Sequence, residues 1–244
     1  MSGGGAREPA RARLAALLDS LGLEASAPAP CAYLEGRASR LVVVRPERLL
    51  PPLYQLFLDL NFRRIGDVVY RPQCDGCRAC RQLRLPVAAF RANRAHRRCW
   101  KRNADVQASV GRPRPTEEKH AVYRRYLEAR HDGQMSGSRE EFDSFLHDAA
   151  ELTEEVVFRL DGRLLGAGIF DATPQGLSAV YFYFDPAFAA RSPGVFNVLW
   201  LLAECRRRAL PWLYLGYQVA GAPTMEYKSS FRPHETLGED GRWR

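Results

Sequence analysis

Residues 70–105 read YRPQCDGCRACRQLRLPVAAFRANRAHRRCWKRNAD and place three closely spaced cysteines before a dense basic run. Cys74, Cys77 and Cys80 follow the pattern C-x-x-C-x-x-C, whose two-residue gaps let successive thiolates turn toward one cation or an iron-sulfur cluster. A tetrahedral site needs one more ligand, and Cys31 is the best candidate because it lies in a turn-prone segment. We predict that these four cysteines hold zinc or an iron-sulfur cluster. Free reduced thiols are the alternative.

The basic run carries six Arg or Lys between Arg91 and Arg102, and no carboxylate interrupts it. Such a cluster attracts phosphate, and the interleaved Trp100 can stack on a base. A solvated surface without a ligand is the alternative. The pattern favours nucleic acid, and the predicted phosphate contacts are Arg94, Arg97, Arg98, Lys101 and Arg102.

The composition is that of a globular protein. The chain has 244 residues, of which 46% are hydrophobic and 26% charged, and its net charge of +8 favours polyanionic partners. No apolar run approaches the roughly 20 residues of a membrane span, and no signal peptide is evident. We therefore expect a cytoplasmic protein that has no membrane partner.

Four motifs occur in a fixed order along the chain. They are YRPxCxxCxAC and RxxRRxxKRNAD within residues 70–105, QGLSAVYFYFDP at 175–186 and LGYQVAGAPTMEYKSSFRPHE at 215–235. This set resembles the aminoacyl-tRNA protein transferases, the arginyltransferase family, and particularly its short bacterial aspartate/glutamate leucyltransferase branch. The resemblance runs from about Cys31 to Arg244. One departure is Ala95-His96, where the family usually has Ser-Gln.

Composition and breaker residues predict three segments. Residues 1–30 are rich in Gly, Ala and Pro and predict a flexible tail around a short apolar piece at 14–23. Residues 31–110 form an N-terminal module with the cysteines and the basic run. The Gly-Pro loop at 110–115 predicts the boundary of a catalytic domain at 111–244.

Hydrophobic periodicity predicts the elements of both parts. In the N-terminal module, we expect strands at 40–44 and 83–87 and a helix from Pro51 to Leu60. Pro86 marks the second strand as an edge or a strand end. The catalytic domain should contain helices after Thr116 and Ser138, antiparallel strands at 156–160, 163–170 and 177–184, a helix at 193–209 and a strand at 212–217. This order is similar to that of GNAT acyltransferases, which the resemblance also implies. The predicted fold class is therefore α+β with a GNAT-like domain.

In a fold of that kind, the strand that ends near Asp185 and the helix that begins near Gly194 diverge to leave a cleft. Backbone N–H groups at that helix start attract phosphate or an acyl oxygen, so we assign Gly194 to tRNA binding. The resemblance implies attack of a protein α-amine on an aminoacyl-tRNA ester, which requires no cofactor for the chemistry. We expect Asp185 to accept the amine's proton and Tyr214 and Tyr217 to donate to the oxyanion.

An acceptor that begins with Asp or Glu needs a cation for its carboxylate, and Lys228 and Arg232 are the candidates. The donor pocket should be apolar for leucine and acidic for arginine. The strands near the predicted cleft supply mostly apolar side chains, which favours leucyl-tRNA as the donor and makes an arginyl donor the alternative. The apolar side chains are Val180, Phe182, Phe184, Leu213 and Leu215, and the only acids are Asp185 and Glu226.

The sequence is compatible with three functions. The first is leucyl transfer from leucyl-tRNA to proteins with N-terminal Asp or Glu, which marks them for N-degron degradation. The second is acetyl transfer from coenzyme A, which the single glycine in residues 189–194 disfavours because a GNAT pyrophosphate loop usually has more. The third is a non-catalytic, metal-containing RNA-binding protein, which would have no use for a second domain with a cleft.

Overall fold

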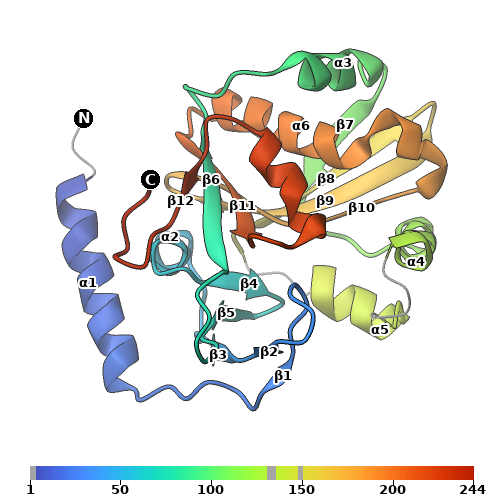
Figure 1. The fold of residues 1–244 in the computed structure, drawn as a ribbon. Coiled ribbons are helices and arrows are strands. Elements are labelled where there is room, and N and C mark those ends of the chain that lie inside the picture. Colours follow the sequence, from blue (N-terminus) through green and yellow to red (C-terminus); the bar gives the residue numbers. More distant parts are fainter. Residues whose placement is uncertain (1–3, 131–135, 148–150) are drawn as a thin grey trace.

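The computed structural model describes residues 4–130, 136–147 and 151–244 and has the predicted α+β architecture (Figure 1). Its helices are α1 (Gly4–Ser20), α2 (Pro51–Asp59), α3 (Arg94–Arg102), α4 (Glu117–Arg130), α5 (Arg139–Phe142) and α6 (Pro193–Arg207), with a π-helix η1 (Asp143–His147) and 3-10 helices η2 (Pro186–Arg191) and η3 (Pro223–Ser230). Its strands are β1 (Ala29–Pro30), β2 (Ala38–Ser39), β3 (Leu41–Val44), β4 (Arg63–Ile65), β5 (Val68–Pro72), β6 (Arg81–Pro86), β7 (Gln107–Gly111), β8 (Thr153–Leu160), β9 (Arg163–Thr173), β10 (Gly176–Phe184), β11 (Trp212–Gln218) and β12 (Glu235–Thr236).

The central feature is a seven-stranded sheet in the order β12-β6-β11-β10-β9-β8-β7. Strands β8, β9 and β10 pair antiparallel, which confirms the prediction from the Asp161-Gly162 turn. The connection through α6 instead makes β10 and β11 parallel. The sequence of two helices, three antiparallel strands, one helix and one strand is the one predicted for a GNAT-like domain.

Helices cover both faces of this sheet (Figure 1). On one face, Leu199 and Leu202 of α6 pack in one core with Phe170 and Leu213 of the strands. On the other face, α4 packs in a separate core with β9 and β10. Helix α6 begins with Pro193 in its first turn and keeps its apolar residues at helical spacing, which explains why its position was predictable.

The N-terminal part packs on the sheet face opposite α6. It consists of α2 and a small sheet in the order β3-β5-β4. Tyr54 and Phe57 of α2 form a core with Tyr214 of β11, whereas the preceding residue, Leu213, faces α6. The predicted helix and the strand at 40–44 are confirmed by α2 and β3. The strand predicted at 83–87 is confirmed as β6 of the large sheet. Pro86 is the last residue of β6, which is not an edge strand because it lies between β11 and β12.

Two predictions about segments differ from the structure. Helix α1 lies where a flexible tail was expected, because Leu18 packs in the α2 core and Arg11 donates from Nη1 to the Gly241 carbonyl at 2.8 Å. The boundary predicted near residue 110 falls at the end of β7. Strands β6 and β7 belong to the seven-stranded sheet, so these two strands lie in the same layer as the C-terminal strands. None of the described helices has the length and apolar character needed to cross a membrane.

A buried ion pair joins the small sheet to the large one. Arg64 of β4 donates from Nε and Nη2 to the two oxygens of Asp171 on β9, at 2.9 and 2.8 Å. The side chains are 2% and 0% exposed, and the Thr153 hydroxyl donates to the same carboxylate at 2.7 Å. This two-point geometry fixes β4 against β8 and β9.

We predict that Asp171→Ala lowers the free energy of unfolding by about 3–5 kcal/mol, because it leaves the Arg64 guanidinium buried without its partner. Glu151→Ala is the matched control, since the Arg48–Glu151 pair is 66% and 57% exposed and should contribute less than about 1 kcal/mol. Urea denaturation measures both. Equal losses for the two variants would contradict the role given to the buried pair.

Candidate functional site

The two parallel strands β10 and β11 stay paired over three residues only. Their register covers Gly176 with Trp212, Leu177 with Leu213 and Ser178 with Tyr214. Both strands then shift register against their other neighbours, β10 between Ala179 and Tyr181 and β11 between Tyr214 and Gly216. The two strands therefore separate beyond this point, whereas the sequence predicted a cleft between the end of β10 and the start of α6.

Arg63 of β4 reaches into this separation. Its Nη1 donates to the Ser178 hydroxyl at 2.8 Å, and its Nη2 donates to the Ala179 carbonyl. The Tyr54 hydroxyl lies 3.4 Å from the same Ser178 oxygen. Arg63 is thus held by β10 at the last residues before the strands diverge.

Tyrosines surround this guanidinium. The Tyr217 hydroxyl donates to the Asn61 carbonyl at 2.8 Å and lies 3.3 Å from the Tyr70 carbonyl. Burial raises the pKa of Tyr70 and raises that of Tyr217 well above its ordinary value, and the Arg63 charge only partly opposes these shifts. The phenols are therefore neutral. Among the residues that the structure describes, no carboxylate pairs with Arg63.

A second buried cation lies nearby on η3. Lys228 is 6% exposed, and its Nζ donates to the Tyr217 carbonyl at 2.6 Å. Burial is the main cause that lowers the pKa of Lys228 to about 7, and repulsion from the Arg63 charge is the second. Within the described ranges, Lys228 also has no carboxylate partner. We call Arg63 and Lys228 the buried cation pair. It is suited to binding an anion between the separated strands, because a buried charge without a counterion is costly.

Arg63 was missed by the sequence analysis. The only signal was two adjacent arginines, Arg63 and Arg64, between the apolar residues Phe62 and Ile65. That spacing places the two side chains on opposite faces of a short strand, so that one meets Asp171 and the other enters the strand separation.

Asp185 has different surroundings. It caps η2 through a hydrogen bond from the Ala187 N–H at 3.0 Å, and Arg125 of α4 donates to its other oxygen at 2.8 Å. Burial favours the neutral acid, but these two contacts outweigh it and lower the pKa of Asp185. A carboxylate stabilised in this way is a weak base. The geometry therefore does not favour Asp185 as the proton acceptor.

The two predicted oxyanion donors are also engaged within the protein. Tyr214 is fully buried against α2, where Gln55 donates to its hydroxyl at 3.0 Å. Tyr217 directs its hydroxyl to backbone carbonyls of the N-terminal part. In the described part of the chain, no hydrogen bond joins Asp185 to either tyrosine. The three predicted catalytic residues therefore have separate partners and are not gathered around one point.

The remaining predicted substrate contacts lie apart from one another. Arg232 is exposed and donates from Nε to the Ser229 carbonyl at 3.2 Å, whereas Lys228 is buried. Gly194 lies in the first turn of α6, where an added Cβ would meet no atom within 4 Å. Packing therefore does not require glycine there.

The apolar side chains considered for the donor pocket lie in two separate cores. Leu213 and Leu215 both belong to the core between the sheet and α6, because alternation along β11 turns them to that face. Phe184 packs on Tyr126 of α4, with ring centroids 5.2 Å apart. Leu213 and Leu215 therefore belong to the half of these side chains that alternation was expected to hide in the core.

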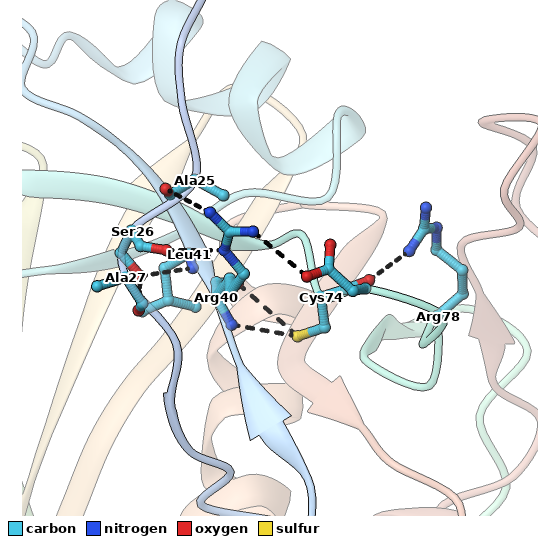
Figure 2. A network of polar contacts seen from close by, with 8 residues as sticks. Ala25, Ser26, Ala27, Arg40, Leu41, Cys74 and Arg78 are labelled. Carbon is cyan, nitrogen blue, oxygen red and sulfur yellow. Dashed lines mark hydrogen bonds and ion pairs between the residues drawn. The ribbon is translucent and has the colours of Figure 1, made fainter.

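Cys31, Cys74 and Cys77 lie close enough to Cys80 to affect its pKa. Figure 2 shows Cys74 between Arg40 and Arg78. The Cys74 sulfur accepts a hydrogen bond from the Arg40 N–H at 3.4 Å, and Arg78 donates to the Cys74 carbonyl at 2.7 Å. Burial, with the charges of Cys31, Cys74 and Cys77, raises the pKa of Cys80 to about 12. Across the described residues, however, no three His, Cys, Asp or Glu side chains are arranged as a metal site.

Helix α3 presents the basic run to solvent. Asn93 and His96 form a reciprocal capping box at its start, and the five arginines and lysines predicted to contact phosphate are all exposed. Throughout the described residues, none of these five forms an ion pair with a carboxylate. The His96 ring stacks on Phe231 at 4.5 Å, so α3 packs directly against the residue that follows η3.

Comparisons with known proteins cover most of the chain. Residues 118–238 match the family model described as "Arginine-tRNA-protein transferase, C terminus", and residues 29–98 match its N-terminus counterpart. The chain is 45% identical over 222 residues to an aspartate/glutamate leucyltransferase of Halorhodospira halophila, covering 88% of this chain and 92% of that protein. It is 43% identical to one of Pseudomonas paraeruginosa, covering 90% and 94%. The crystal structure of FemX aligns with a TM-score of 0.49 at 11% identity, covering 86% of this chain and 69% of FemX.

We predict that anaerobically purified protein carries one metal centre on Cys31, Cys74, Cys77 and Cys80, and that Cys77→Ser removes it. Metal analysis and absorption spectra test this. Cys205→Ser is the control, because Cys205 is buried against the Trp212 carbonyl and should leave the metal content unchanged. A fully folded protein without metal would rule out the centre, and a Cys31→Ala variant that keeps its metal would show that another residue is the fourth ligand.

We predict that α3 contacts RNA phosphates, because its exposed cations have no carboxylate partners among the described residues. Single Ala variants of Arg97, Arg98 and Lys101 should each reduce the salt slope of tRNA binding by about 0.7–0.9. Arg45→Ala is the control, since Arg45 is exposed but paired with Asp67 at 3.0 Å. If the α3 variants keep the wild-type affinity and slope, RNA binds another face.

Proposed function

Since this chain belongs to the arginine-tRNA-protein transferase family, we propose that it transfers leucine from leucyl-tRNA to proteins whose first residue is Asp or Glu. The names of its relatives, aspartate/glutamate leucyltransferases at 45% and 43% identity, support both the donor and the acceptor. The modified N-terminus would mark the protein for N-degron degradation.

The buried cation pair is the observation that carries the proposal for the acceptor. Arg63 lies in the segment that matches the N-terminal family model, and Lys228 lies in the segment that matches the C-terminal one. The side-chain carboxylate of an acceptor Asp or Glu would neutralise two cations that otherwise lack an anion among the described residues. An acceptor that begins with Ala or Lys would leave the pair unneutralised and should bind poorly. Exposed Arg232 would contribute less than Lys228.

The reaction itself needs little covalent help. The neutral α-amine of the acceptor attacks the ester carbonyl, a C–N bond forms, and the bond to the tRNA ribose oxygen breaks. The proton of the amine ends on that ribose oxygen. Because the ester is already activated, holding the two reactants in place supplies most of the rate. The contacts of Asp185 with η2 and Arg125 support a positioning role for this residue.

Electrostatics favour leucine over arginine as the donor. An arginyl group would need a carboxylate in its pocket. Of the two acids that the sequence suggested for this pocket, Asp185 is paired with Arg125, and Glu226 is exposed. A non-catalytic RNA-binding protein would have no use for the buried cation pair.

We predict that the protein labels Asp- and Glu-initiated peptides with leucine, and that Lys228→Met raises KM for these peptides about ten-fold or more, because removing one charge-assisted contact costs roughly 1.5–3 kcal/mol. Labelling is measured by mass spectrometry with mixed leucyl- and arginyl-tRNA. Arg232→Met, an exposed cation in the same segment, is the control and should change KM less. Equal labelling of all peptides, or preferred transfer of arginine, would contradict the assignment.

The Lys228→Arg variant tests, in the same assay, whether the positive charge at this position binds the acceptor. In the free wild-type enzyme, Lys228 is charged below pH 7 and increasingly neutral above it, because its pKa is lowered to about 7. KM for Asp peptides should therefore rise as the pH increases from 6 toward 8, whereas an arginine stays charged and should remove this dependence. KM that does not change with pH in the wild type would show that the Lys228 charge does not bind the acceptor.

A further inference from the structure

A hollow of about 290 Å³ lies between the basic helix α3 and helix α6. Phe90, Leu199 and Leu202 form its apolar floor, and Trp100 of α3 stands at its wall with 44% of its surface exposed. The Trp100 ring packs on Phe196 of α6, with centroids 5.6 Å apart, so its orientation is fixed from one side. We call this feature the α3–α6 hollow. The two helices lie side by side above the sheet in Figure 1.

The rim of the hollow is cationic. Arg97, Lys101 and Arg206 line it, and no acidic residue does. Arg97 donates to the Ala92 carbonyl, and Arg206 donates to the Val87 carbonyl at 3.4 Å. These contacts use one N–H group of each guanidinium. No ion pair with a carboxylate engages the three rim cations anywhere in the described residues.

We propose that the α3–α6 hollow binds an unpaired nucleobase of the donor tRNA; this inference rests on the proposed function. The apolar floor and the exposed Trp100 ring suit the flat face of a base, and the rim cations suit the phosphates on either side of it. An unpaired base is required, because bases stacked within an RNA helix do not expose their faces to an aromatic side chain.

The position of the hollow agrees with this role. Its lining includes His96, whose ring stacks on Phe231 at 4.5 Å, one residue after the end of η3. The Arg91 N–H also donates to the Arg232 carbonyl at 3.3 Å. A base in the hollow would therefore sit against the element that packs on the segment carrying Lys228. The RNA would be anchored beside the acceptor site and not at a remote surface.

The test compares two labelled RNA probes, a blunt duplex and the same duplex with an unpaired 3′ extension. Wild-type protein should prefer the extended probe. Trp100→Ala removes the stacking ring, and Ala203→Phe fills the hollow from α6, so each should weaken binding of the extended probe about ten-fold. Neither variant removes a cation, so affinity for the blunt duplex and the salt slope should not change. Ala129→Phe, on the exposed side of α4, is the matched control and should bind both probes as the wild type does.

Two results would overturn the inference. One is wild-type affinity of both Trp100→Ala and Ala203→Phe for the extended probe. The other is displacement of the extended probe by vesicles of phosphatidylglycerol through a Trp100-dependent contact, which would assign the hollow to an anionic amphiphile. Leucine transfer is measured on the same preparations. Loss of the probe preference in a protein that still transfers leucine would count against the hollow alone, and a Trp100-dependent preference without transfer would count against the proposed function alone.

Discussion

The short parallel pairing of β10 and β11 is the constraint on which the rest of the site depends. Three residue pairs hold the strands together, and beyond Ser178 and Tyr214 the sheet is no longer continuous. Backbone groups released from a ladder need other partners. Arg63 supplies one of them by donating to the Ala179 carbonyl, and Lys228 supplies another by donating to the Tyr217 carbonyl. The two cations thus stabilise the separated strands in the absence of a substrate.

These contacts leave both charges without a counterion, and the proposed recognition of an anion rests on that electrostatic cost. Arg64, one residue after Arg63, is neutralised by Asp171 and fixes the fold. Arg63 and Lys228 are equally buried, yet their partners in the described chain are carbonyls and a hydroxyl, which orient a cation without neutralising it. The shift in the pKa of Lys228 to about 7 is the measure of that incomplete compensation. A bound carboxylate would complete it, so binding energy is available for acceptors that carry one.

The positive charge of the chain is therefore divided between two environments. On α3 the cations are exposed and clustered, which suits many weak contacts to a polyanion that depend on salt. Between β10 and β11 they are buried and few, which suits one specific carboxylate. The stacking of His96 on Phe231 places these environments next to each other. His96, one of the two residues that depart from the family motif, both caps α3 and makes this contact.

Much of the fold was predictable because its signals are local. The Asp161-Gly162 turn indicated the β8–β9 hairpin, the spacing of Val195, Val198, Leu199 and Leu202 indicated α6, and the density of cations indicated an exposed basic surface. The metal centre predicted on Cys31, Cys74, Cys77 and Cys80 stays a prediction, because no three His, Cys, Asp or Glu side chains among the described residues are arranged as a metal site.

The composition of the site was decided by tertiary structure. Arg63 and Lys228 lie far apart in the sequence, and no local pattern relates them. Asp185 could be recognised as a strand-end carboxylate, but its pairing with Arg125 depends on how α4 packs against β10. Simple alternation would have placed Tyr217 on the α6 face with Leu213 and Leu215. A register shift at Gly216, whose φ of +81° favours glycine, turns Tyr217 toward Arg63 instead. A sequence reports the period of a strand, but only the packed sheet shows where that period is interrupted.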